Sequence, residues 1–225
     1  MVGPKLIVIE GSDASGKKTQ TKLLVDLLHQ RRIETLQMSF PVYDSPTGKV
    51  VSQYLAGEFG PTNSIDPKIA STWYALDRYA HMPRMKRSMG SGATVVCDRY
   101  VESNMGHQGG KIESCEERAK FFKWCDQLEY DTLELIRPSV CFFLHVPWEM
   151  SHKLIAMRAL AEGRELDGHE ADKTHLKMAE SSYLQLAGIY NWITIECCDG
   201  AEMRAVDDIS REIRERLDEW LITFL

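Results

Sequence analysis

One stretch near the start of the chain constrains its fold more than any other. Residues 6–9 form a continuous apolar run, a short loop is bounded by Gly11 and Gly16, and Lys17 follows directly. A glycine, four residues and then Gly-Lys is the spacing of a phosphate-binding loop, in which backbone N–H groups surround an anion. The N-terminal end of the next helix and the Lys17 ammonium attract the same anion. The stretch therefore predicts a strand, a P-loop and a helix in succession.

The residues around the loop support this interpretation. The apolar run is typical of a parallel strand covered on both faces, and leucines recur at helical spacing after the loop. The same glycine spacing without such flanks is more often an ordinary surface turn. The candidate cofactor-binding residues are those of the loop and the first helical turn: Gly11, Ser12, Asp13, Ala14, Ser15, Gly16, Lys17, Lys18 and Thr19.

Lys18 departs from the usual motif, which has Ser or Thr at this position as a hydroxyl ligand of Mg²⁺. Thr19 does not simply replace it, because one step along a helix rotates the side chain by about 100°. Mg²⁺ often keeps several waters and binds substrate phosphates, so the ion is still expected. Asp98, at the end of a later strand, is the candidate metal-binding residue, directly or through water.

The composition is that of a globular chain whose partners are small molecules. The net charge of −6 over 225 residues argues against a nucleic-acid-binding surface. The six cysteines form no Cys-x-x-Cys pair, so we expect reduced, structural thiols and no metal site built from them. The chain enters its first strand without a signal peptide, and no apolar run approaches the ~20 residues of a membrane span. We therefore expect a cytoplasmic protein without a membrane partner.

Five strand-like runs alternate with helical segments along the chain. The strands are expected at residues 6–9, 33–40, 93–98, 139–146 and 192–195. Helices are expected after residue 17 and at residues 47–55, 68–89, 115–136, 148–160, 170–190 and 201–222. Residues 101–110 are polar and small, and we expect a flexible segment that contacts a ligand. The alternation predicts one α/β domain over residues 1–225, a five-stranded parallel sheet with helices on both faces, of the P-loop kinase type.

Side chains on a helix and at a strand end are candidates for binding a ligand. Tyr74 and Arg78 lie one helical turn apart on one face. They form either an aromatic platform for a base with a guanidinium at its edge, or a core aromatic beside a solvated arginine. Arg99 follows the strand that ends at Asp98, where it clamps a phosphate or forms a structural ion pair. We interpret His145 as a hydrogen-bonded structural histidine.

A charged, glycine-flanked segment at residues 161–168 is a candidate mobile lid, and we place the lid near residues 158–170. Arg158 and Arg164 are its cations, and Arg158 is added to the candidate cofactor-binding residues. The alternative is a solvated turn between two helices.

Several motifs, in order over almost the whole chain, resemble those of thymidylate kinases. They are Glu10-Gly11-Ser12-Asp13-x-x-Gly16-Lys17, Phe40-Pro41-x-Tyr43, Tyr74-Ala75-Leu76-Asp77-Arg78, Asp98-Arg99-Tyr100-x-x-Ser103-Asn104 and Gly163-Arg164-x-x-Asp167-x-His169-Glu170. The resemblance implies transfer of the γ-phosphoryl group of ATP to dTMP, giving dTDP, with ATP and Mg²⁺ as cofactors. It also implies a homodimer built on packed helices.

The resemblance also implies roles for single residues. Tyr74 matches the ring that stacks on thymine, Arg78 the arginine that reaches its O4, and Arg99 the arginine on the acceptor phosphate. The implied substrate-binding set is Phe40, Pro41, Tyr43, Tyr74, Arg78, Arg99, Asn104, His107 and Gln108. The implied catalytic set is Lys17, Arg99, Arg164 and Asp13. Because Ala14 and Ser15 stand where one subgroup has an arginine, the lid has to supply that cation.

Departures from the family pattern leave alternatives open. His107 stands where an aromatic ring usually blocks a ribose 2′-OH, and Leu144-His145-Val146 replaces the more usual Leu-Asp-Val. Together with Lys18, these residues keep two other functions in view. One is a kinase for another acceptor nucleotide such as dUMP, and the other is a catalytically weak P-loop protein that only binds nucleotide.

Overall fold

The computed structural model describes residues 5–163, 165, 166, 170 and 172–223. Its centre is a sheet of parallel strands in the order β2-β3-β1-β4-β5. The strands are β1 (Leu6–Gly11), β2 (Thr35–Ser39), β3 (Thr94–Asp98), β4 (Val140–His145) and β5 (Ile193–Glu196). The five predicted strands and their parallel arrangement are confirmed. β1 lies at the middle of the sheet, so the loop that follows it opens at the carboxyl edge between β3 and β4.

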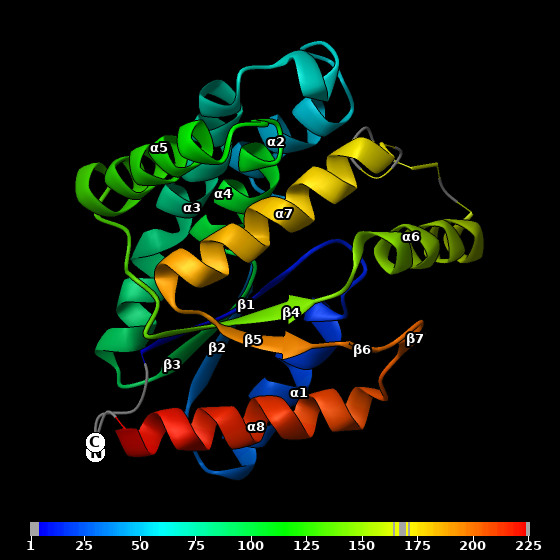
Figure 1. Ribbon diagram of the computed structural model, residues 1–225. Coiled ribbons are helices and arrows are strands. Elements are labelled where there is room, and N and C mark those ends of the chain that lie inside the picture. The colour runs from blue at the N-terminus through cyan, green and yellow to red at the C-terminus, as the bar shows by residue number, and fades with distance from the viewer. Residues whose placement is uncertain (1–4, 164, 167–169, 171, 224–225) are drawn as a thin grey trace.

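Helices cover both faces of the sheet (Figure 1). They are α1 (Lys17–Gln30), α2 (Pro46–Leu55), α3 (Pro67–Gly90), α4 (Val101–Gly109), α5 (Cys115–Asp126), α6 (Trp148–Glu162), α7 (Lys173–Tyr190) and α8 (Val206–Thr223). Alternate residues of β1 enter two different apolar cores, because successive strand side chains point to opposite faces. Ile7 and Ile9 pack with α1 and α8, whereas Leu6 and Val8 pack with α3, α4 and α5.

Local signals in the sequence set the starts of the helices. Ser45 accepts the Gly48 N–H and precedes Pro46 at the start of α2. Asp66 accepts the N–H groups of Lys68 and Ile69 and precedes Pro67 at the start of α3. Each pair combines a capping side chain with a proline whose missing N–H is not needed in the first helical turn.

Residues 101–110 are not the flexible segment that their composition predicts. They form α4, which is almost wholly buried. Val101 and Met105 enter the core, and the glycines let α7 approach closely. A Cβ on Gly106 would lie 2.5 Å from the Tyr183 ring. Polar side chains on this helix are therefore held rigidly by packing, which the polarity of the segment did not indicate.

Two predicted helix boundaries are also wrong. The single helix expected at 115–136 is α5 followed by a π-helical turn, η2 (Gln127–Thr132). The wider turn lets the adjacent residues Glu129 and Tyr130 both reach buried partners on other helices. Near the C-terminus, Cys198–Asp199 and Glu202–Met203 pair as a short antiparallel hairpin, β6–β7, so α8 begins at Val206 rather than near residue 201.

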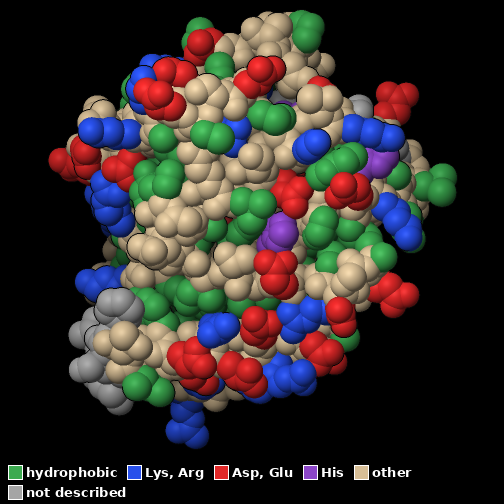
Figure 2. Space-filling view, in the orientation of Figure 1, with side chains coloured by type: hydrophobic (Ala, Val, Ile, Leu, Met, Phe, Trp, Pro, Cys, Tyr) green, Lys and Arg blue, Asp and Glu red, His purple; other side chains and the backbone are tan. Residues whose placement is uncertain are grey.

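The structure agrees with the predictions made for the cysteines and for His145. All six cysteines are free. His145 lies between Glu180 and Glu196, at 2.9 Å and 2.7 Å, in agreement with a structural histidine. Figure 2 shows acidic and basic side chains intermixed on the face that it displays. Among the described residues, none of the helices combines the length and apolar character needed to cross a bilayer.

The close packing of α4 on α7 predicts opposite effects for two glycine substitutions. Gly106→Ala should destabilise the protein by about 1–3 kcal/mol, because its Cβ would overlap the buried Tyr183 ring. Gly188→Ala is the matched control, since an added Cβ in α7 meets nothing within 4 Å. This variant should be neutral or more stable by up to about 1 kcal/mol. Urea denaturation measures both, and equal effects would contradict the packing argument.

Candidate active site

The loop between β1 and α1 has the geometry of an anion-binding loop. Gly11 has φ +155°, and a Cβ there would lie 2.6 Å from the carbonyl oxygen of Leu144, so a larger residue cannot replace it. Gly16 has φ +88° and forms the N-cap of α1. Lys17 is buried at the first helical position, and its Nζ donates to the Ser12 carbonyl at 2.6 Å. The ammonium thus folds back over the loop, where a phosphate would meet it.

Burial and neighbouring charges shift the pKa of Lys17. Burial and the nearby Arg99 charge lower the pKa of Lys17 to about 8, although the carboxylates of Asp13, Asp98 and Glu10 raise it. A bound anion would stabilise the ammonium and raise this pKa. The site is therefore matched to a ligand that brings its own negative charge.

Arg99 is the central cation of the site. Its backbone is left-handed, at φ +66°, which is an uncommon conformation for a residue other than glycine. Its guanidinium donates to Ser103 Oγ at 2.8 Å, lies 2.9 Å from His107 Nε2, and forms an ion pair with Asp13. Burial raises the pKa of Asp13, but the charges of Arg99, His107 and Lys17 outweigh this effect and hold the pKa well below its ordinary value. The structure therefore brings the P-loop acid and the strand-end arginine into direct contact.

Glu10 fixes the backbone of this arginine and was not among the predicted site residues. The carboxylate is fully buried, and its Oε1 accepts the Tyr100 N–H at 2.7 Å, while the Arg99 N–H donates to the Ile9 carbonyl at 3.1 Å. The two bonds hold the peptide groups on either side of the strained residue. Burial raises the pKa of Glu10 to about 7, against the lowering effect of Arg99. The sequence did contain a signal for the role of Glu10. An acidic residue within an apolar strand is buried, and a buried acid needs a buried partner.

The predicted substrate-binding residues line one pocket, which we call the α3–α4 pocket. It is lined by Asp13, Phe40, Pro41, Tyr43, Leu55, Tyr74, Arg78, Arg99, Tyr100, Ser103, Asn104, His107 and Gln108. All nine predicted substrate-binding residues are in this set, together with Asp13. They come from the loop after β2, from α3 and from the segment after β3. Their individual roles stay predictions.

Arg78 is not the solvated arginine of the alternative interpretation. It is buried, and its Nε and Nη2 donate to the two oxygens of Glu129 at 2.5 Å and 2.6 Å. Its Nη1 donates to the Tyr100 carbonyl at 3.2 Å. The guanidinium is thus held in one orientation at the pocket wall. Glu129 could not be found from sequence, because its position depends on the π-helical turn.

Two amide side chains of α4 leave acceptor oxygens unused. Asn104 donates through Nδ2 to Glu129 at 3.1 Å, and Gln108 donates through Nε2 to the Tyr54 hydroxyl at 3.4 Å. Asn104 Oδ1 and Gln108 Oε1 are buried and have no hydrogen-bond partner within the part of the chain that the structure describes. Since buried polar atoms are nearly always satisfied, these oxygens favour a ligand that donates hydrogen bonds. The ring N–H of a pyrimidine base is such a donor.

Asp77 anchors the loop that closes one side of the α3–α4 pocket. This fully buried carboxylate accepts the Val42 N–H at 2.8 Å and the hydroxyls of Ser45 and Thr47 at 2.9 Å and 2.8 Å. The loop begins at the cis peptide bond between Phe40 and Pro41. Asp77 lies within one of the motifs that resemble those of the family, but no role was predicted for it.

The remaining predicted residues lie at the edges of the site. Lys18 and Thr19 are exposed on α1. Arg158, on α6, donates to Glu170 at 2.6 Å. Arg164 and residues 167–169 of the predicted lid lie outside the described residues. The lid therefore stays a prediction.

The residues at this edge offer little for a dedicated metal site. Asp98 is half-buried at the end of β3, beside Ile9 of β1. Over the residues that the structure describes, no group of three or more His, Cys, Asp or Glu side chains is arranged to hold a metal ion. A carboxylate here suits an ion held mainly by substrate phosphates and water.

Comparison with known proteins agrees with this geometry. The sequence profile of the thymidylate kinase family matches residues 9–207. The chain is 31% identical to a thymidylate kinase of Plasmodium falciparum over 209 residues, covering 93% of this chain and 87% of the relative. It is 28% identical to a probable thymidylate kinase of Methanocaldococcus jannaschii, covering 95% of each chain. The solved thymidylate kinase of Candida albicans has the same fold, with a TM-score of 0.71 at 21% identity over 96% of this chain and 91% of that one.

The histidine pair beside Arg99 predicts sensitivity to acid. His175 is buried and stacks on His107 with ring centres 6.1 Å apart. Burial lowers the pKa of His175 from 6.5 to about 4, although Asp13 raises it. The folded protein thus binds fewer protons here than the unfolded chain, so stability falls as pH falls from 6.5 to 4, by up to about 3 kcal/mol.

His175→Gln should flatten this part of the stability–pH profile, which urea denaturation between pH 4 and 7.5 measures. His29→Gln, at an exposed position on α1, is the control and should leave the profile unchanged. If His175→Gln kept the wild-type slope, the acid sensitivity would lie elsewhere.

Proposed function

The chain belongs to the thymidylate kinase family, and we propose that the loop of residues 11–16 holds the phosphates of ATP while the α3–α4 pocket holds dTMP. The protein is a nucleoside monophosphate kinase that phosphorylates dTMP, with ATP as phosphate donor. The observation that carries the site assignment is the contact of Arg99 with Asp13, which joins the P-loop to the α3–α4 pocket.

The donor side uses backbone amides and one lysine. Backbone N–H groups of the loop from Gly11 to Gly16 surround the β- and γ-phosphates, and Lys17 neutralises the charge that develops as the phosphoryl group leaves. Because Lys17 already lies against the Ser12 carbonyl, it is held near its working position before the nucleotide binds.

The acceptor side positions a nucleophile that is already anionic. Arg99 binds the dTMP phosphate, and its contacts with Ser103, His107 and Asp13 orient the guanidinium. No general base is required, because the attacking oxygen belongs to a phosphate group. Catalysis then consists of alignment and charge neutralisation, to which both Lys17 and Arg99 contribute.

The base is held deeper in the same pocket. Tyr74 stacks on thymine, and the fixed Arg78 guanidinium lies at the O4 edge. The unused oxygens of Asn104 and Gln108 supply acceptors for the N3–H donor. A purine or cytosine presents a different pattern of donors and acceptors to these groups, so the pocket favours thymine.

Mg²⁺ and the lid complete the proposal. Asp98 would hold Mg²⁺, directly or through water, and the ion would supply neutralisation of charge on the phosphates of ATP. Arg158 and Arg164 are the cations of a lid near residues 158–170, which covers ATP and excludes water. Arg158 would exchange its bond to Glu170 for a phosphate contact.

The functional form is a cytoplasmic homodimer. Six free cysteines suit a reducing compartment. On α3, Ile69, Leu76 and Tyr79 are 54%, 49% and 51% exposed, and this apolar face suits a second copy of the chain. Sedimentation velocity should show a dimer for the wild type and a monomer for Leu76→Glu. A wild-type monomer at micromolar concentration would contradict the proposal.

The acceptor assignment predicts a clear order of substrates. A coupled assay of ADP release with Mg²⁺-ATP should show the highest kcat/KM for dTMP among dTMP, dUMP, dGMP, CMP and thymidine. Thymidine should be inactive, because it lacks the phosphate that Arg99 binds. Faster turnover of dGMP or CMP would overturn the base recognition by Tyr74 and Arg78 while leaving the phosphoryl-transfer site intact. Faster turnover of dUMP would overturn only the preference for thymine over uracil, since both bases have the same O4 and N3–H.

Removal of the central arginine should affect chemistry far more than folding. Arg99→Ala should lower kcat/KM by at least about 100-fold, because both the acceptor phosphate and the transition state lose a bidentate cation. Arg87→Ala removes an exposed arginine from α3 and is the matched control, with activity close to wild type. Near-normal activity of Arg99→Ala would refute the role given to Arg99.

A further inference from the structure

A second cavity lies at the amino edge of the sheet, where β4 and β5 begin. It has a volume of about 260 Å³ and is formed by α4, the end of α5, the π-helical turn η2, the end of α7 and α8. We call it the basal cavity. Its lining residues are Glu102, Met105, Asp126, Tyr130, Arg137, Pro138, Ser139, Val140, Cys141, Tyr190, Asn191, Trp192, Ile193 and Trp220. None of them belongs to the proposed phosphoryl-transfer site, which opens at the other edge of the sheet.

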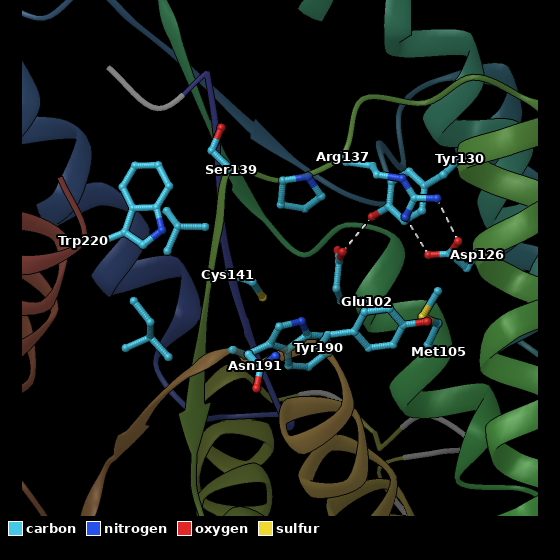
Figure 3. A pocket seen from close by; sticks show the side chains of 14 residues that line it. Glu102, Met105, Asp126, Tyr130, Arg137, Ser139, Cys141, Tyr190, Asn191 and Trp220 are labelled. Atoms are coloured by element: carbon cyan, nitrogen blue, oxygen red, sulfur yellow. Dashed lines mark hydrogen bonds and ion pairs between the residues drawn. The ribbon is translucent and has the colours of Figure 1, made fainter. Parts of the chain in front are cut away.

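A buried acid forms part of the wall. Glu102 is 6% exposed, and its Oε1 accepts the Tyr130 hydroxyl at 2.6 Å. Its other oxygen, Oε2, is buried and finds no hydrogen-bond partner in the described ranges of the chain. Figure 3 shows this carboxyl group meeting Tyr130 on one side of the cavity, opposite Trp220. Burial raises the pKa of Glu102 to about 8, so the group is protonated at neutral pH and can donate as well as accept.

The other walls suit a flat, aromatic ligand. Tyr130, Tyr190, Trp192 and Trp220 come from separate parts of the chain and bring aromatic rings to the lining. The rings of Tyr190 and Trp192 stack on each other, with centres 6.4 Å apart. Aromatic rings combined with placed polar groups are typical of sites for small heterocycles.

The charges of the cavity disfavour an anion. Arg137 is the cation of the described lining, and it is paired with both oxygens of Asp126 at 2.7 Å and 2.8 Å. Its guanidinium also lies over the Tyr130 ring, 4.3 Å from the ring centre. An incoming phosphate or carboxylate would have to displace these contacts. A neutral, weakly basic ligand avoids this loss and can use Glu102 instead.

We propose that the basal cavity is a second small-molecule site, which takes a planar heteroaromatic base with an amidine edge, a ring nitrogen beside an amino group. The ring stacks against the aromatic wall, and the amidine edge faces Glu102. On binding, the proton of the carboxyl group passes to the ring nitrogen, which leaves a carboxylate beside an amidinium. The ligand thereby supplies the hydrogen bond that Oε2 lacks.

The basal cavity and the α3–α4 pocket share two structural elements. On α4, Glu102 and Met105 line the basal cavity, whereas Asn104 and Gln108 line the α3–α4 pocket. On η2, Tyr130 holds Glu102, while its neighbour Glu129 holds Arg78 and Asn104. A ligand that shifts the Glu102–Tyr130 contact therefore acts on a turn that also orients Arg78. Occupancy of the basal cavity should change the KM for dTMP.

Calorimetric titration of the full chain tests the site, with dTMP and a non-hydrolysable ATP analogue present at saturation. The probe is 2-aminobenzimidazole, and benzimidazole, which lacks the amino group, is the matched compound. The wild type should bind the probe about tenfold more tightly than benzimidazole. Glu102→Gln keeps the shape of the side chain but cannot give up a proton, so it should lose this tenfold difference. Failure of the wild type to bind the probe, or an unchanged tenfold preference for the probe over benzimidazole in Glu102→Gln, would overturn the proposal.

A second variant tests the place of binding. Cys141→Leu puts a larger apolar side chain into the cavity and keeps Glu102, so it should abolish probe binding. Thermal denaturation checks that both variants fold. In the wild type the probe should change the KM for dTMP by about fivefold, and in Cys141→Leu it should have no effect. A shift that persists in Cys141→Leu would place the probe elsewhere. Calorimetry measures binding to the basal cavity directly. A failure of this proposal can therefore be distinguished from a failure of the dTMP assignment.

Discussion

The parallel pairing of β1 with β3 is the constraint on which the site depends. The register places Ile9 beside Asp98, so Glu10 and the P-loop start at the level where Arg99 leaves its strand. The Arg99 N–H donates to the Ile9 carbonyl, and the Tyr100 N–H donates to Glu10. These two hydrogen bonds hold the peptide groups around the left-handed Arg99. On the other side of β1, Gly11 approaches the Leu144 carbonyl of β4 too closely for any side chain. A change in either pairing would move the loop relative to the arginine.

The cationic side chains of the site are held in fixed orientations by neighbouring groups. Lys17, Arg99 and Arg78 are buried or half-buried, and each is held by a named partner before any ligand binds. Buried ion pairs of this kind add little to net stability, because desolvation offsets the attraction. Their contribution is orientation. The arrangement suits a reaction that depends on alignment and charge neutralisation rather than on a nucleophilic side chain.

The helix α4 and the turn η2 contribute both to the basal cavity and to the residues that form or orient the α3–α4 pocket. The helix α4 is almost wholly buried, and within η2 the buried residues are Glu129 and Tyr130. Glycines on α4 allow α7 to pack closely, so this helix has little freedom to absorb a displacement. Under the proposal for the basal cavity, a ligand bound there would act on the α3–α4 pocket through these shared elements.

The sheet, the order of its elements and the P-loop could be predicted from the sequence alone. These features follow from local patterns: apolar runs, helical spacing, capping residues and the glycines of the P-loop. The residues of the α3–α4 pocket were also identified, through motifs that resemble those of one family, although their roles are untested. The sequence did not indicate that residues 101–110 form a buried helix, because the packing of α7 on Gly106 overrides their polar character. Nor could it find Glu10 holding Tyr100, Glu129 holding Arg78, or Asp77 holding the loop after β2. Those partners are 90, 51 and 35 or fewer residues apart in the chain, so which buried charge meets which donor depends on how the helices and strands pack in the folded protein.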